Sequence, residues 1–234
     1  DSIGSPATAK NLLTVGAAEN DRPPGSGGYS SYTWGTAWPS DYPANPLKDD
    51  YLSQSADGTN QGLAAFSSRG PTDDARFKPD LVAPGTDVIS CRSHAPGAGT
   101  GWGAHPNTNY AFSGGTSMST PLTAGAAALV RQFYVLRRNV ASPSAALLKG
   151  TMINGGRSLT PGQYGTGAQR EIAAPPRPNN AEGWGEVDLE ESLFPVLPRR
   201  LVACDTNVLS TSRTNTFALL VGSTNRLRFT LAYT

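Results

Sequence analysis

Short apolar runs, separated by polar stretches rich in turn-forming residues, form the pattern of the first half of the chain. Residues 12–17 and 81–85 are apolar at most positions, which is typical of strands that are buried on both faces of a parallel sheet. A third run at 87–91 predicts another strand. The stretches 20–62 and 94–109 are rich in Gly and Pro, so we expect them to be loops on the surface.

The clearest helix is predicted to follow Ser117. Apolar residues recur there with the 3.6-residue period of one helix face, at Leu122, Ala126, Leu129, Val130, Phe133 and Leu136. A second helix is predicted after Ser142, because serine caps a helix and the Pro143 that follows suits its first position. Alternating strands and helices of this kind indicate an α/β fold, with a mainly parallel sheet flanked by helices.

The pattern of apolar and polar residues changes after a linker that contains Pro195 and Pro198. Three segments beyond it predict β-strands, at 201–203, 216–221 and 226–231. We therefore predict two domains, a larger one over residues 1–195 and the beginning of a β-sandwich over residues 196–234. The second would be incomplete, because an independent sandwich generally needs more strands.

Composition and charge argue against several classes of protein. The 19 basic and 18 acidic residues give a net charge of +1 without a basic stripe, so no nucleic-acid partner is expected. No apolar run approaches the ~18 residues that a membrane-spanning helix needs. Cys91 and Cys204 lack the spacing of zinc or redox motifs. A disulfide between them and two buried thiols both remain open.

Ser117 is the candidate for chemistry in this sequence. A serine nucleophile needs an exposed hydroxyl, a rigid backbone and hydrogen-bond donors that face the developing oxyanion. The start of a helix offers such donors, because its first N–H groups have no partner within the helix and its dipole end is positive. Gly114 and Gly115 leave room for a substrate backbone. From the residues alone, a simple N-cap remains the alternative role for Ser117 or Thr116.

The wider sequence around Ser117 carries a family resemblance. The segment 115–121, followed by 124–129, resembles the serine motif of the subtilase family, the subtilisin-like serine proteases of peptidase family S8. Further segments similar to that family occur in its order, at 10–17, 65–71, 78–85 and 183–188. Residues 1–195 therefore resemble the C-terminal portion of a subtilase catalytic domain. Residues 196–234 look like the beginning of the β-sandwich that some bacterial members carry after it.

The resemblance implies a serine endopeptidase that hydrolyses peptide bonds through an acyl-enzyme on Ser117. In this family an aspartate, a histidine and the serine follow one another along the chain. The oxyanion would be held by the Ser117 amide and an asparagine side chain, with Gly115 and Thr116 along the substrate backbone. The resemblance further implies a protein or peptide substrate, no metal or organic cofactor for catalysis, and an extracellular location.

The sequence contains no segment like the Asp and His motifs of the family. The 116 residues before Ser117 already match segments that follow the family's histidine. His94 and His105 lie in a turn-rich stretch and are expected to be idle, and we assign Asp80 and Asp87 no part in a triad. We therefore expect a fragment or one polypeptide of a split enzyme, inactive without the N-terminal part of the same protease.

The same resemblance implies that the parent protein could hold structural calcium. The turns at 49–50, 57–60 and 73–74 carry the oxygen ligands that calcium prefers. None has the dense alternation of acids of a calcium loop, so exposed acidic turns are the favoured interpretation.

Four aromatic residues gather in the stretch 20–62, namely Tyr29, Tyr32, Trp34 and Trp38. Packing that anchors this long stretch is the favoured role, and contact with substrate is the alternative.

Two other functions stay open. A catalytically dead, protease-like fragment could serve a structural or binding role. An esterase or another serine hydrolase is the second possibility, but the chain has no Gly-x-Ser-x-Gly motif, which is the mark of the α/β-hydrolase class.

Overall fold

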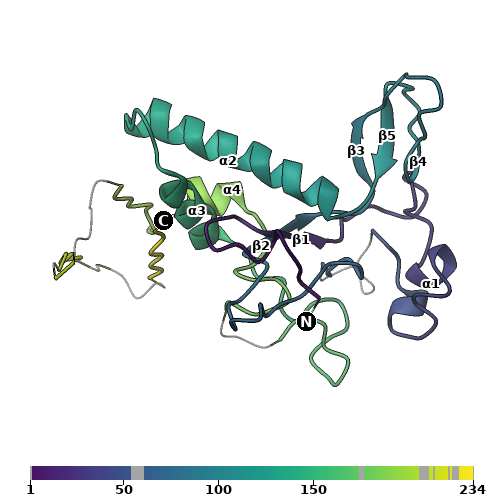
Figure 1. The fold of residues 1–234 in the computed structure, drawn as a ribbon, viewed down its shortest axis with the longest axis horizontal. Helices are drawn as coiled ribbons and strands as arrows, with labels where there is room; N and C mark the ends of the chain where they lie inside the picture. Colours follow the sequence, from purple (N-terminus) through teal and green to yellow (C-terminus); the bar gives the residue numbers. More distant parts are fainter. Residues whose placement is uncertain are drawn as a thin grey trace. The chain divides into compact units, whose positions relative to one another are not determined.

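The two apolar runs form the expected pair of parallel strands. The computed structural model describes residues 2–53, 61–173, 177–205, 211–212, 214–220, 222 and 227–233. In it, β1 (Val15–Ala18) pairs in parallel with β2 (Leu81–Pro84), with Val15 opposite Leu81. Most of their side chains are buried, which explains why the runs are apolar without alternation. The parallel α/β expectation is confirmed here (Figure 1).

A second, antiparallel sheet follows β2. It has the order β3-β5-β4, formed by β3 (Val88–Cys91), β4 (Gly103–Ala104) and β5 (Tyr110–Ser113). The strand predicted at 87–91 is therefore confirmed, although its partner is antiparallel. The predicted loop at 94–109 contains the short strand β4. Strand β5 leads directly into the long helix α2 (Figure 1).

Helix α2 (Thr116–Arg138) confirms the predicted helix but only half of its predicted buried face. Ala126, Val130 and Phe133 are buried, whereas the three leucines of the predicted face are 45%, 52% and 65% exposed, in the order Leu122, Leu129 and Leu136. The buried face of α2 instead begins with two polar residues, Ser119 and Thr123. Their hydroxyls can be buried because each donates a hydrogen bond to a backbone carbonyl, which the apolar period cannot reveal.

The described chain divides into two compact units. The first comprises Asp1–Ala124 and Arg157–Glu186, and the second comprises Gly125–Gly156 and Val187–Thr234. Helix α2 contributes its first turns to the first unit and the rest to the second. The predicted domain boundary between residues 195 and 196 falls inside the second unit, and the assignment of two domains stays a prediction.

The stretch 20–62 is more than a surface loop. It contains α1 (Trp34–Ala37) and the 3-10 helix η1 (Leu47–Asp49). Trp34 and Leu52 are fully buried and pack in a core cluster with Ala17 of β1. The expectation of a purely surface position is therefore wrong in part, because large apolar side chains within this polar stretch bury against the sheet.

The second unit contains two shorter helices. Helix α3 (Ala145–Gly155) begins after Ser144, whose Oγ accepts from the Leu147 amide at 3.0 Å. The predicted cap at Ser142 is therefore two residues too early. Helix α4 (Leu189–Leu193) begins after Asp188, whose carboxylate accepts from the Glu191 amide at 2.8 Å. Both caps satisfy amides that have no partner within their helix.

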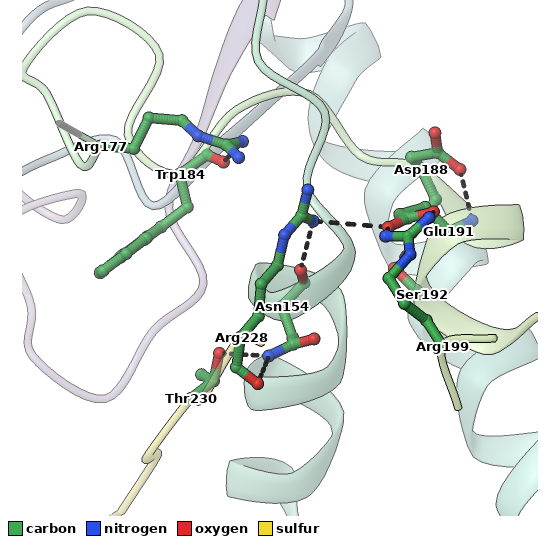
Figure 2. A network of polar contacts seen from close by, with 9 residues as sticks. All are labelled: Asn154, Arg177, Trp184, Asp188, Glu191, Ser192, Arg199, Arg228 and Thr230. Atoms are coloured by element: carbon green, nitrogen blue, oxygen red, sulfur yellow. Dashed lines mark hydrogen bonds and ion pairs between the residues drawn. The ribbon is translucent and has the colours of Figure 1, made fainter. Parts of the chain in front are cut away.

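We call the described residues after the linker, from residue 199 onward, the tail. A polar network joins the tail to α3 and α4 within the second unit (Figure 2). Arg228 Nη1 donates to the Asn154 carbonyl oxygen at 3.0 Å, and Asn154 Nδ2 donates to Thr230 Oγ1 at 3.0 Å. Arg228 also lies 3.6 Å from a carboxylate oxygen of Glu191, which pairs with Arg199. The tail is thus held by side-chain contacts to α3 and α4.

The predicted strands of the tail are not formed. In the described parts of 201–203, 216–221 and 226–231 the backbone has no strand pairing, and Leu220 and Leu231 are 101% and 86% exposed. A strand is stable only when a neighbour pairs its backbone and a second layer covers its apolar face. The described tail residues have no paired neighbouring strand and no covering layer, so their alternating pattern does not produce a strand. Val221 and Arg226 lie outside the described residues.

No helix in the described parts of the chain is long and apolar enough to cross a membrane.

Candidate active site

The start of α2 is fixed to the carboxyl ends of the parallel strands. The Gly85 amide, directly after β2, donates to the Ala18 carbonyl oxygen at 2.8 Å, and the Gly115 amide donates to the Gly85 carbonyl oxygen at 2.7 Å. Ser119 Oγ donates to the Pro84 carbonyl oxygen at 3.2 Å. These bonds place Ser117 at the edge of the sheet where α/β proteins bind their ligands.

Ser117 has the exposure that a nucleophile requires. Its side chain is exposed, and its hydroxyl has no hydrogen-bond partner among the residues that the structure describes. The Ser117 hydroxyl therefore does not act as a helix cap that accepts from a backbone amide. A base and a substrate can both reach such a hydroxyl.

Two backbone amides beside this hydroxyl have no acceptor among the residues that the structure describes. The Met118 and Ser119 amides donate to the Gly115 carbonyl oxygen at 2.9 and 3.4 Å, whereas the Thr116 and Ser117 amides donate to no described group. Gly115 has φ +134°, which favours glycine and lets the chain turn into the helix. The Thr116 and Ser117 amides can therefore serve as donors to a ligand, and the oxyanion role of Ser117, with Gly115 and Thr116 along the substrate backbone, stays a prediction.

Pro121 interrupts the hydrogen-bond ladder of α2. Because the helix begins at Thr116, Pro121 is in its second turn. A regular helix would have an amide at position 121 that donates to the Ser117 carbonyl oxygen. Proline removes that donor, so the Ser117 carbonyl stays outside the helical ladder.

The comparisons with known proteins decide the family. Residues 1–185 match the model of the subtilase family. The chain belongs to the subtilase family. The match covers the start of α2 and both parallel strands, so the candidate site lies within the part of the chain that matches the family.

Individual relatives of this subtilase cover parts of the chain. It is 34% identical over 178 residues to the Serine protease/ABC transporter B family protein tagD of Dictyostelium discoideum, covering 65% of this chain and 9% of that protein. It is 37% identical over 133 residues to Serine protease AprX of Bacillus subtilis, covering 56% of this chain and 22% of that protein. The chain thus spans between about a tenth and a quarter of the length of these curated relatives.

Among solved structures, the CspB protease of Clostridium perfringens is similar with a TM-score of 0.48 and 23% sequence identity. That comparison covers 86% of this chain and 29% of the CspB chain.

Neither histidine of this subtilase is hydrogen-bonded to Ser117 in the parts of the chain that the structure describes. His94 shares a hydrogen bond with Asn109 Oδ1 at 3.1 Å, and His105 Nδ1 accepts from the Asn107 amide at 3.1 Å. Both lie in the segment between β3 and β5, and no hydrogen bond among the described residues joins either of them to Ser117. A general base has to be within hydrogen-bond reach of the proton that it takes.

Asp80 and Asp87 have structural partners. Asp80 accepts from the Thr14 amide and from Lys78 Nζ, both at 2.7 Å. Asp87 is fully buried and accepts from the Tyr29 amide and from Ser53 Oγ, both at 2.7 Å. Each carboxylate therefore ties a distant segment to the region of β2, which gives them a role in folding.

Three buried carboxylates form a cluster that the sequence did not reveal. Glu19, Asp50 and Glu171 are 1%, 3% and 8% exposed. Burial, reinforced by the charge of Glu171, raises the pKa of Asp50 to about 7. Burial, together with the Asp50 charge, raises the pKa of Glu19 well above its ordinary range, and burial likewise raises the pKa of Glu171.

The hydrogen bonds of the cluster come from groups distant in sequence. Asp50 Oδ2 accepts from Gln163 Nε2 at 2.8 Å and from the Tyr164 hydroxyl at 2.6 Å, while its Oδ1 has no partner in the structure. Glu19 Oε1 accepts from Trp34 Nε1 at 3.0 Å, and its Oε2 is likewise without a partner. The favoured interpretation of the turn at 49–50 as exposed is therefore wrong for Asp50.

The structure gives no support for a calcium site in its described parts. They contain no group of three or more His, Cys, Asp or Glu side chains arranged to hold a metal ion. Asp49 pairs with Asn45 Nδ2 at 2.7 Å, and Asp74 pairs with Arg76. Residues 57–60 lie outside the described residues, so calcium in the parent protein stays a prediction.

The aromatic residues of the stretch 20–62 pack as expected. The Tyr29 and Tyr32 rings are 5.0 Å apart, and the Trp34 and Trp38 rings are 5.7 Å apart. The cluster also includes Trp102, from the segment between β3 and β5, whose ring lies 5.3 Å from that of Tyr29. No pattern in the sequence indicates that Trp102 joins them.

Cys91 and Cys204 are both exposed, and neither is in a disulfide. The disulfide is therefore not formed, and the two cysteines are free thiols as the other interpretation had it, but exposed rather than buried.

Proposed function

We propose that the protein carrying this chain is a serine endopeptidase that hydrolyses peptide bonds through an acyl-enzyme on Ser117. The observation that supports it most is the exposed Ser117 hydroxyl beside two amides that have no acceptor, in a chain of the subtilase family. Such amides stabilise the negative charge that develops on the carbonyl oxygen when the hydroxyl attacks. No metal or organic cofactor is needed for this chemistry.

The Ser117 proton needs an acceptor. In a serine protease a histidine takes it and later donates it to the leaving amine, while an aspartate orients the imidazole. His94 and His105 have other partners. We therefore propose that the histidine, the aspartate and the oxyanion asparagine come from an N-terminal part of the same protease, and that this chain is inactive by itself.

Substrates and location follow from the same proposal. The substrate would be a protein or peptide, because a peptide bond supplies both the carbonyl that the hydroxyl attacks and the amine that leaves in a serine protease. The family resemblance supports an extracellular location. Structural calcium elsewhere in the parent protein fits the same resemblance.

A fluorophosphonate probe tests the proposal, because it reacts with serine hydroxyls that are activated by a base. We expect labelling of Ser117 in the natural full-length protein and none in its Ser117→Ala variant, which should also lose kcat for peptides by on the order of 10⁶. The isolated chain should not be labelled. Labelling of the isolated chain at Ser117 would show that it contains a base and would overturn its proposed inactivity.

The same experiment separates the alternatives. Absence of labelling in the natural full-length protein would favour a catalytically dead protein with a structural or binding role. Labelling with turnover of esters but not of peptides would favour an esterase. Ser117-dependent cleavage of a denatured protein supports the endopeptidase.

A further inference from the structure

The indole of Trp102 lies directly on the loop that carries the nucleophile. A β-carbon on Gly114 would be 2.1 Å from two atoms of the Trp102 six-membered ring, Cη2 and Cζ2. No side chain can therefore stand at position 114 unless the indole moves. Gly114 is three residues before Ser117, so the indole contacts the backbone that leads into the nucleophile.

Trp102 is held in place from two sides. Its amide donates to the Phe112 carbonyl oxygen of β5 at 2.8 Å. Its ring stacks on Tyr29, with the centroids 5.3 Å apart and the planes at 14°, and it contacts Trp38 at 5.6 Å and Phe66 at 6.3 Å. A ring fixed in this way loses little freedom when a ligand binds to it, so the surface is preorganised.

Some rings of the aromatic cluster are buried, and others are partly exposed to solvent. Trp34 is fully buried, whereas Trp102 and Tyr29 are half-buried and Tyr32 is 47% exposed. A cluster that served packing alone would have no need to extend to the nucleophile loop or to keep ring surface in contact with water. Exposed aromatic surface beside polar groups is the usual composition of a binding site.

We propose that Trp102 forms an apolar wall of the substrate-binding surface beside Ser117 and favours cleavage next to aromatic side chains. This inference rests on the proposed function and adds a substrate preference to it. A peptide bond attacked by Ser117 has to pass close to Gly114, so a neighbouring aromatic side chain of the substrate can stack on the exposed part of the indole.

Cleavage profiles of the natural full-length protein test the preference. A denatured protein is digested, and mass spectrometry counts Phe, Tyr and Trp within two residues of each cleaved bond. The wild type should favour bonds next to these residues, and Trp102→Gln should reduce that preference by about tenfold, the scale on which an apolar pocket discriminates. Trp102→Phe should retain it. Trp184→Ala is the matched control, because Trp184 is a 38% exposed tryptophan and only its backbone makes described hydrogen bonds.

A binding measurement keeps this inference separate from the proposed function. In the Ser117→Ala background, where cleavage is absent, a Phe-containing decapeptide should bind about tenfold more tightly than the same peptide with Ala. The Trp102→Gln change should abolish that difference, and Trp102→Phe, which keeps a ring on Gly114, should preserve it. Equal binding of the two peptides, or an unchanged preference in Trp102→Gln, would overturn the proposal even if the enzyme is active. If the peptides are discriminated but the wild type cleaves nothing, the proposed function fails instead.

Discussion

Gly85 and Ser119 are packed so closely that a β-carbon on Gly85 would lie 2.5 Å from Ser119 Oγ. The same β-carbon would lie 2.6 Å from the Ala17 side chain. Ser119 is itself fully buried and bonded to Pro84. The end of β2, the core of β1 and the first turn of α2 therefore meet at a point that admits only glycine.

Replacing Gly85 with alanine should shift the start of α2. Overpacking of this kind costs about 1–3 kcal/mol, so we expect the free energy of unfolding of Gly85→Ala to fall by that amount. Because the Gly85 carbonyl positions Gly115, probe labelling of Ser117 in the natural full-length protein should also slow. Chemical denaturation and labelling rates measure the two effects.

Gly4→Ala is the control for this substitution. A β-carbon on Gly4 would meet no atom within 4 Å, so its free energy of unfolding and labelling rate should stay close to the wild type. If Gly85→Ala behaved in the same way, the close packing at the start of α2 would not be a constraint on the site.

The buried carboxylates predict that stability falls as pH rises. The pKa of Asp50 is raised from 3.8 to about 7, so between these values the folded protein holds a proton that the unfolded chain releases. The free energy of unfolding therefore decreases from about pH 4 to 7 and levels off above that range. Glu19 and Glu171, whose pKa values are also raised by burial, act in the same direction.

Asp50→Asn should remove part of this dependence. At pH 4 the variant and the wild type should unfold with similar free energies, and at pH 8 the variant should be more stable by on the order of 4 kcal/mol. Denaturant unfolding at a series of pH values measures this, with the exposed Asp73→Asn as the control. A wild type whose stability rises between pH 4 and 7, with no gain in Asp50→Asn, would contradict the predicted protonation.

The buried pair of Lys78 and Asp80 predicts a large loss of stability when one partner is removed. Lys78 Nζ lies 2.7 Å from Asp80 Oδ2 and also donates to Thr14 Oγ1 at 3.0 Å. Lys78→Met would leave a buried carboxylate without its cation, at a cost of about 3–5 kcal/mol in the free energy of unfolding. Thermal or chemical unfolding measures it. Lys10→Met, at an exposed lysine, should change little, and equal effects of the two variants would show that the pair contributes no more than a surface charge.

The sequence determined those features that depend on neighbouring residues. Consecutive apolar positions located β1 and β2, because a strand buried on both faces has no polar side. The long helix and the position of Ser117 at its start were also predicted. The subtilase motif covers this same local stretch, so the family could be recognised and Ser117 could be chosen as the candidate nucleophile without a structure.

Tertiary structure decided which side chains are covered and which meet. The apolar period of α2 could not show that Leu122 and Leu136 stay exposed, because the buried side of a helix depends on which distant segments pack against it. Glu171 accepts from the Leu63 amide, 108 residues away, and no local pattern announces such a contact. Trp102 reaches Gly114 in the same way, through the fold of the β3–β5 segment. Burial and close contact depend on two segments that come together in the fold. A single stretch of sequence determines only the properties of one of them.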